Sequence, residues 1–227
     1  MRRRRVELEL KLEALRQALV IYDEFAGTLD SACRPGCSRC CSDRVTVTTL
    51  EVAALLESLP AAQTERLILS AGARSSGTVL TTNALAEICA EGGDPPEAEE
   101  PAADACPLLE DALCPIYALR PFNCRCFVSR AACTEQGYAE VDEATVAVNT
   151  LFLQTIEHLD AGGCTGYLPD VVAALADPER AQAYREGTLG CADCGLAPNR
   201  PLRVLMVPPE HRARIDPLVA RLMEIRV

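Results

Sequence analysis

The chain has 227 residues, of which 49% are hydrophobic and 24% charged, with 13 cysteines and only 2 histidines. A chain of this length can bury a sizeable core, so the cysteines are not needed as the cross-links of a very small secreted domain. The formal net charge of -11 repels phosphate backbones, which argues against a nucleic-acid partner.

An amphipathic helix is predicted near the start of the chain, over residues 6–29. Its apolar residues recur at alternating steps of four and three, at Leu8, Leu12, Leu15, Leu19, Tyr22, Ala26 and Leu29. This stripe fits a helix packed on its own domain or a helix that binds a partner. Charged residues interrupt the apolar ones after the Arg2 to Arg5 run, so neither a signal peptide nor a membrane span is predicted. We therefore expect a cytoplasmic protein without a membrane partner.

Most of the remaining elements are also predicted to be helices. Thr48 stands three residues before Glu51, the spacing of a capping box, which predicts a helix that runs through Leu59. Further helices are predicted over residues 64–72, 82–90, 142–159 and 209–225, and over 170–186 with an interruption at Pro178. Short extended segments are expected at 45–48 and 202–207. The expected fold class is mainly α, a small helical domain with irregular cysteine-rich metal-binding loops.

Composition divides the chain into three segments. Residues 1–30 are the N-terminal helix, residues 31–168 a cysteine-cluster domain, and residues 169–227 a helical extension with a CxxC pair. Within the second segment, residues 91–105 concentrate glycine, proline and acidic residues, which is typical of an exposed loop. We expect this loop to be an insertion between two halves of one site.

The first cysteine cluster lies in a predicted loop and places four thiols within nine residues, at Cys33, Cys37, Cys40 and Cys41. The two-residue spacer between Cys37 and Cys40 lets both sulfurs reach one metal ion while loop amides donate hydrogen bonds to them. Because cytoplasmic thiols are mostly reduced, metal ligation is favoured over a disulfide framework.

The second cluster begins at Cys106 and includes Cys114 and Cys124, with Tyr117 and Arg120 between the last two. A guanidinium beside a thiol favours the thiolate, so Arg120 is expected to support the site. Tyr117 fits a hydroxyl donor to sulfur, a weak ligand or a half-buried ring.

A further pair, Cys191 and Cys194, lies in the C-terminal segment. It fits an accessory metal pair, a redox pair or a reducible disulfide.

The spacing of these cysteines resembles a known family. The chain reads C-x3-C-x2-C-C, then C-P-L-L-x4-C-x-I-Y-x-x-R-P-x-x-C-R and later G-C-x-G, over about residues 33–166. This pattern is similar to the bacterial YkgJ-like cysteine-cluster family, described as zinc- or iron-chelating domains, although Cys33 is one residue further from Cys37 than in that family. The resemblance implies eight metal ligands, namely Cys33, Cys37, Cys40, Cys41, Cys106, Cys114, Cys124 and Cys164. A similar module in flagellin lysine N-methylases links the family to iron–sulfur chemistry.

The ligand set suggests the cofactor and the function. Eight thiolates around one divalent ion would leave about six negative charges uncompensated, so two ions or an iron–sulfur cluster are expected. Soft sulfur ligands with hardly any imidazole favour iron or an iron–sulfur cluster, with zinc as the alternative. The predicted function is metal chelation by a cysteine-cluster protein. The alternative is an iron–sulfur-dependent redox enzyme or one that modifies a protein or peptide partner, and the sequence leaves open whether the chain is an enzyme.

Overall fold

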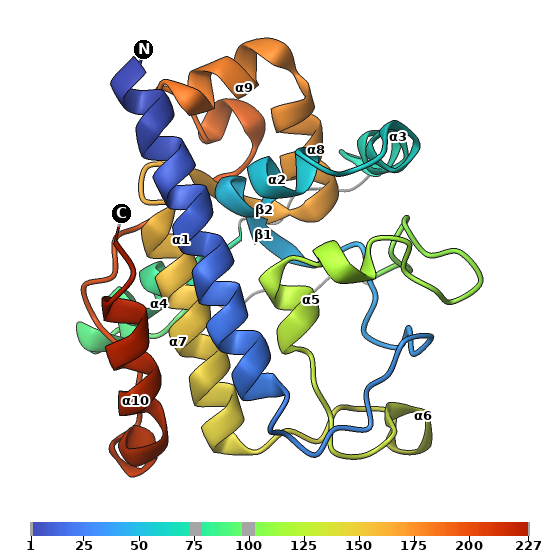
Figure 1. The fold of residues 1–227 in the computed structure, drawn as a ribbon, viewed down its shortest axis with the longest axis vertical. Helices are drawn as coiled ribbons and strands as arrows, with labels where there is room; N and C mark the ends of the chain where they lie inside the picture. The colour runs from blue at the N-terminus through green and yellow to red at the C-terminus, as the bar shows by residue number, and fades with distance from the viewer. Residues whose placement is uncertain (1, 73–78, 97–102, 227) are drawn as a thin grey trace.

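The protein is described by a computed structural model that covers residues 2–72, 79–96 and 103–226 (Figure 1). The α-helices of these residues are α1 (Arg2–Ala26), α2 (Thr49–Leu56), α3 (Ala61–Ser70), α4 (Thr82–Ala90), α5 (Phe122–Cys126), α6 (Cys133–Gln136), α7 (Glu143–Leu159), α8 (Leu168–Ala176), α9 (Pro178–Arg185) and α10 (Arg212–Met223). Short 3-10 turns are η1 (Tyr117–Leu119), η2 (Ala192–Cys194) and η3 (Pro209–His211). The predicted mainly α class is confirmed.

A small antiparallel sheet of β1 (Thr46–Thr48), β2 (Cys164–Tyr167) and β3 (Ala197–Pro198) lies between the helices, in the order β1-β2-β3. The strand expected at 202–207 is wrong. Gln154 on α7 donates to the Val204 carbonyl and accepts from the Met206 amide, so side-chain groups satisfy this backbone and no ladder forms.

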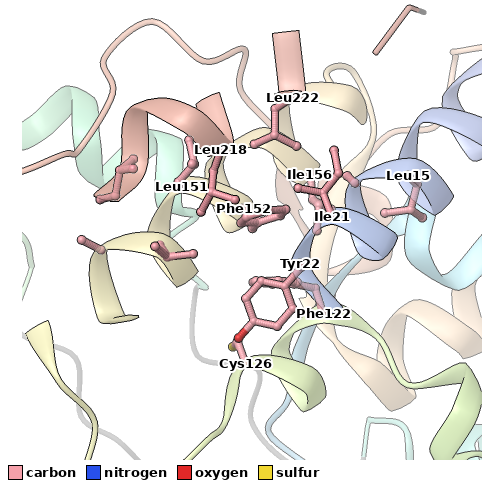
Figure 2. Close-up of a cluster of buried hydrophobic side chains, with 14 of the residues drawn as sticks. Leu15, Ile21, Tyr22, Phe122, Cys126, Leu151, Phe152, Ile156, Leu218 and Leu222 are labelled. Atoms are coloured by element: carbon pink, nitrogen blue, oxygen red, sulfur yellow. The ribbon is translucent and has the colours of Figure 1, made fainter. Parts of the chain in front are cut away.

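The first apolar core lies where α1 packs against α7 and α10. Its centre is a group of three buried rings, with Tyr22 edge-on to Phe122 and Phe152 at centroid distances of 4.7 and 5.1 Å (Figure 2). Leu12, Leu15 and Tyr22 of the predicted stripe are buried in this core. The N-terminal helix therefore packs on its own domain, and its stripe is not left for a partner.

A second apolar core holds α2, α3, α8 and the sheet together. It is built from aliphatic side chains such as Val47, Leu67 and Val171, which are at most 2% exposed. Cys106, Cys114 and Cys124 pack on the edge of this core. The cysteine-bearing loops thus rest on an apolar base, on the opposite side of the molecule from α10 (Figure 1).

Two buried carboxyl groups connect the elements. The predicted capping box of Thr48 and Glu51 is confirmed, and Glu51 also accepts from the Phe122 amide at 2.8 Å, at the start of α5. Asp160, at the end of α7, accepts from the hydroxyls of Thr49 and Tyr184 at 2.6 and 2.7 Å. Each carboxyl group therefore ties the N-terminal region of α2 to a distant segment.

Glycine is required beside the second of these carboxyl groups. A Cβ at Gly163 would lie 2.4 Å from both Asp160 and Thr49. No side chain can enter that space without displacing the network.

The predicted acidic insertion lies partly outside the described residues, which omit 97–102. Its far end returns to the first cysteine loop, because Asp104 donates its amide to the Asp43 carboxyl group. Within the described part of the chain, none of the helices has both the length and the apolar character needed to cross a bilayer.

Candidate functional site

The two cysteine-bearing loops meet at an isolated antiparallel bridge between Ser42 and Ala105. Asp43 donates its amide to the Asp104 carbonyl, and Cys106 donates its amide to the Cys41 carbonyl, both at 3.1 Å. Cys41 and Cys106 therefore lie opposite each other, in a pair whose side chains share one face. The Asp104 amide also donates to the Asp43 carboxyl group, so segments 61 residues apart in the sequence are joined at this point.

A tight turn then brings Cys114 back toward Cys106. Glu110 and Leu113 exchange both backbone hydrogen bonds, at 2.9 and 2.8 Å. Between them, Asp111 and Ala112 adopt φ angles of 49° and 64°. Two successive positive φ values are those of a two-residue hairpin turn, which is costly without glycine. The chain accepts this strain at a position that determines where Cys114 lies.

Helix α5 positions the third cysteine of this cluster, Cys124. Besides the Glu51 contact at its first residue, α5 is held by Asn123, whose amide donates to the carbonyl and hydroxyl oxygens of Thr46 at 2.9 and 2.8 Å. Phe122 anchors the same helix in the aromatic core. Neither Glu51 nor Asn123 was identified from the sequence as a positioning residue.

These elements create one thiol-lined pocket of about 80 Å³. Seven of the eight predicted ligand cysteines line it, namely Cys33, Cys37, Cys40, Cys41, Cys106, Cys114 and Cys124. Apolar side chains, including Val45, Leu108 and Ile116, form much of the remaining wall. The pocket therefore combines thiols with a largely apolar surface.

Cys164, the eighth predicted ligand, lies elsewhere. It is fully buried in β2 and forms a disulfide with Cys191, with a Cα–Cα distance of 5.7 Å. A sulfur in a disulfide has no thiolate to offer a metal, so its assignment as a ligand is corrected. Of the three roles considered for Cys191 and Cys194, the structure shows a disulfide at Cys191. Its partner is Cys164, and Cys194 is a free thiol.

The predicted metal centre does not form. Over residues 2–72, 79–96 and 103–226, no three His, Cys, Asp or Glu side chains gather in an arrangement that could hold a metal ion. A closed thiolate site needs four sulfurs about 2.3 Å from one ion, and the pocket thiols do not gather in that way. The predicted metal-chelating function is therefore wrong, and so is the alternative prediction of an iron–sulfur-dependent enzyme. The iron or zinc cofactor stays a sequence-based prediction.

The adjacent thiols Cys40 and Cys41 differ in their pKa values. A hydrogen bond from the Cys40 thiol to Cys41 lowers the pKa of Cys41 and raises the pKa of Cys40 well above its usual range. Burial raises the pKa values of Cys106 and Cys124. Cys41 is therefore the one of these four thiols whose pKa is lowered.

Arg120 and Tyr117 both line the pocket. The Arg120 guanidinium lies 3.5 Å from the centroid of the Tyr117 ring, and its buried Nε has no hydrogen-bond partner. The positive charge of Arg120 acts to lower the pKa values of Cys40 and Cys124, although burial and neighbouring thiols outweigh it. Tyr117 thus meets Arg120 through its ring face.

Two cysteines outside the predicted ligand set are separate from the pocket. The Cys126 thiol is buried and donates to the Asn123 carbonyl at 3.5 Å, and burial raises its pKa to about 12. Cys89 is exposed on α4. Cys126 therefore contributes to packing, and Cys89 can serve as a control in experiments on the pocket thiols.

No protein-family model, curated protein or solved structure matches this chain. The resemblance to the YkgJ-like family therefore stays a prediction.

Proposed function

We propose that the protein exchanges electrons with a protein or peptide partner by thiol–disulfide exchange in the thiol-lined pocket, with Cys41 as the attacking thiol and Cys106 as the resolving thiol. The observation that carries this proposal is the register of the bridge between Ser42 and Ala105, which sets these two cysteines opposite each other. The Cys106 amide donates to the Cys41 carbonyl, while the Cys41 amide donates to Ser38, so one of the two bonds of a regular pair forms here. In a regular hydrogen-bonded antiparallel pair the Cα atoms lie about 5.5 Å apart. This separation lies within the range that a disulfide spans.

Cys41 has the surroundings of an attacking thiol. It is half-buried on the pocket wall, and it accepts the hydrogen bond of the neighbouring Cys40 thiol. The thiolate is the nucleophile in exchange, so a bond that stabilises the thiolate increases the reactive fraction. Cys40 has the complementary role of donor, because a bridge between adjacent cysteines would close a strained small ring.

The exchange balances with a disulfide as the oxidant. The Cys41 thiolate attacks one sulfur of the partner disulfide, and the other partner sulfur leaves as a thiolate. Cys106 then attacks the Cys41 sulfur, so that the Cys41–Cys106 disulfide forms and the second partner sulfur leaves. The proton of Cys106 passes to one departing partner thiolate, and the other takes from solvent a proton equivalent to the one that Cys41 released on ionisation. The protein loses two electrons, and the partner disulfide gains them to become a dithiol.

The test is to trap the intermediate. A Cys106→Ser variant treated with a peptide disulfide should accumulate a mixed disulfide at Cys41, whereas the wild type should proceed to the Cys41–Cys106 disulfide. Peptide mapping by mass spectrometry identifies both bonds. Cys89→Ser, which changes an exposed thiol outside the pocket, should behave as the wild type does. Unchanged exchange in Cys41→Ser would refute the proposal.

A further inference from the structure

The rim of the thiol-lined pocket exposes an unusual amount of apolar surface. Leu113 is 54% exposed, Phe127 47% and Tyr117 37%. Leu113 lies against the turn at Gly36, and the Phe127 carbonyl accepts from the Cys33 thiol at 3.8 Å. The exposed apolar side chains therefore border the same opening as the thiols. An apolar surface beside polar groups at a pocket is typical of a binding site.

Positive charge lies in the same region, because Arg34 lines the pocket and Arg39 directly precedes the lining residue Cys40. Arg34 and Arg39 are exposed in the first cysteine loop, and neither makes an ion pair or side-chain hydrogen bond with any described residue. By contrast, the Arg66 side chain pairs with Glu110, and Arg125 pairs with Asp23. Acidic side chains outnumber basic ones in this chain, whose net charge is -11, so a shortage of acidic side chains does not explain why these two arginines lack an ion pair among the described residues.

Three acidic side chains also lie near the pocket. Asp43 lies close enough to Cys106 to raise its pKa, and Asp111 is at the tip of the hairpin turn. Glu110 is paired with Arg66. The exposed side chains described at the mouth thus include several apolar groups and the guanidinium groups of Arg34 and Arg39.

We propose that the partner is a protein or peptide that presents its disulfide in a segment with both apolar and acidic residues next to the cysteine. This inference rests on the thiol–disulfide exchange proposed above. The apolar residues would cover Leu113, Tyr117 and Phe127, and the acidic residues would meet Arg34 and Arg39. Charge complementarity of this kind raises association rates and selects among partners.

A small anionic thiol is the competing ligand. Its carboxylates would satisfy Arg34 and Arg39, but it is too short to cover Leu113 and Phe127 as well. The dependence of the rate on apolar residues in the ligand distinguishes the two, because only a peptide with apolar residues gains free energy from burying those side chains.

The experiment uses the full chain and cysteine peptides carried as mixed disulfides with 2-nitro-5-thiobenzoate. Attack by Cys41 releases the coloured thiolate, and the rate in Cys41→Ser is subtracted to remove the other thiols. One peptide carries leucines before its cysteine and glutamates after it. The second replaces the glutamates with lysines, and the third replaces the leucines with serines. The corresponding disulfide of 2-mercaptoethanol is the small neutral probe.

The first peptide should react fastest. Arg34→Gln with Arg39→Gln should slow it roughly fivefold at low salt, since exposed ion pairs contribute about 0.5 kcal/mol each, and salt should reduce the difference. The matched control, Arg212→Gln with Arg226→Gln, removes two exposed arginines of the C-terminal region and should have no effect. The control double variant should react with the small probe as the wild type does, and the peptide rate of each variant is divided by its rate with the small probe.

A second variant tests the apolar side of the rim. Phe127→Ser should slow the leucine peptides roughly tenfold, the effect of losing one well-buried ring contact. Met223→Ser, which changes an 81% exposed side chain on α10, is its control.

Each remaining outcome is decisive. Equal rates for all three peptides would overturn the docking surface while leaving the exchange proposal in place. A preference for glutamates without one for leucines would also overturn it, in favour of a small anionic thiol. If the small probe reacts with Cys41→Ser as fast as with the wild type, the proposed exchange itself fails.

Discussion

The two apolar cores of this protein are built in different ways. In the core around α1, α7 and α10, side chains repeat at helical spacing and surround the rings of Tyr22, Phe122 and Phe152. The core beneath the thiols is aliphatic, and helices α2, α3 and α8, the strands and the cysteine-bearing loops all contribute to it. The first core is organised around packed aromatic rings. The second is also cross-linked, by the Cys164–Cys191 disulfide.

This difference indicates which part of a small helical fold can carry a group of reactive side chains. Irregular loops can direct many thiols into one pocket, which a straight helix cannot do, because its residues point around the whole axis. The loops gain that freedom only because a rigid scaffold supports them. Four predictions test this division, from the largest expected effect to the smallest.

The aromatic core should give the largest loss of stability. Phe152→Ala removes a fully buried ring from α7, which should lower the free energy of unfolding by about 3–5 kcal/mol. Val146→Ala, at a side chain that is 50% exposed on the same helix, should cost less than about 0.5 kcal/mol. Guanidinium denaturation measures both variants. A loss below about 1 kcal/mol for Phe152→Ala would show that these rings do not dominate the core.

The disulfide should contribute nearly as much to the second core. Replacing both Cys164 and Cys191 with alanine removes a cross-link over a sequence separation of 27 residues, which should cost about 3–4 kcal/mol. Reduction of the wild type should produce the same loss, while Cys89→Ala should be neutral. Thermal unfolding with and without reductant provides the measurement. A variant as stable as the oxidised wild type would mean that packing alone holds this region.

The carboxyl group that joins α7 to α2 should make stability depend on pH. Burial raises the pKa of Asp160 from 3.8 to about 6, despite the hydrogen bonds that it accepts. A raised pKa means that the folded state binds the proton more tightly. Stability from this group is therefore greatest below about pH 4, falls as the pH rises to 6 and is level above it. The full loss is about 3 kcal/mol.

Asp160→Asn isolates this contribution. Its amide can donate to the Tyr184 hydroxyl and accept from Thr49, and it does not titrate. The difference in unfolding free energy between variant and wild type should change between pH 4 and 6. Asp216→Asn, at an exposed position on α10, should show no such change. A constant difference across this range would contradict the assigned cause.

The smallest of the four effects should come from Glu51→Gln. The glutamine oxygen would keep the two Thr48 donors, so its amide nitrogen would face the Phe122 amide, which also donates, and one buried group loses its partner at a cost of about 2 kcal/mol. The start of α5 should loosen, and Cys124 should be alkylated faster by iodoacetamide, as followed by mass spectrometry. Glu57→Gln, at the exposed end of the same helix, should leave alkylation unchanged. Equal alkylation rates in all three proteins would show that the Glu51 contact does not hold the start of α5 in place.

Local signals predicted much of the fold. The stripe through Leu12 and Tyr22, the capping box at Thr48 and the helix after Asp142 depend on residues within a few positions of each other. The predicted interruption of the 170–186 helix at Pro178 is confirmed, and Asp177 caps the second half. Strand β2 was missed because its partners, β1 and β3, are distant in sequence.

The site was predicted in part, for the same physical reason. Dense cysteine clusters indicated which thiols gather, and the structure brings seven of them to one pocket. Whether gathered thiols surround an ion depends on the directions of their side chains, which spacing does not determine. The pairing of Cys164 with Cys191 depends on the arrangement of segments far apart in the chain. The positioning roles of Glu51 and Asn123 likewise depend on tertiary contacts.

The packing of α1 against α10 has a consequence for synthesis on the ribosome. Leu15 needs the layer that includes Leu218 to complete its core, and the two residues lie at opposite ends of the sequence. At about 5–20 residues per second, α10 emerges roughly 10–40 s after α1. During that interval the apolar stripe of α1 lacks part of its cover, while the disulfide-linked half of the protein already has all its parts. The newly made chain should therefore be most vulnerable to aggregation through its first helix.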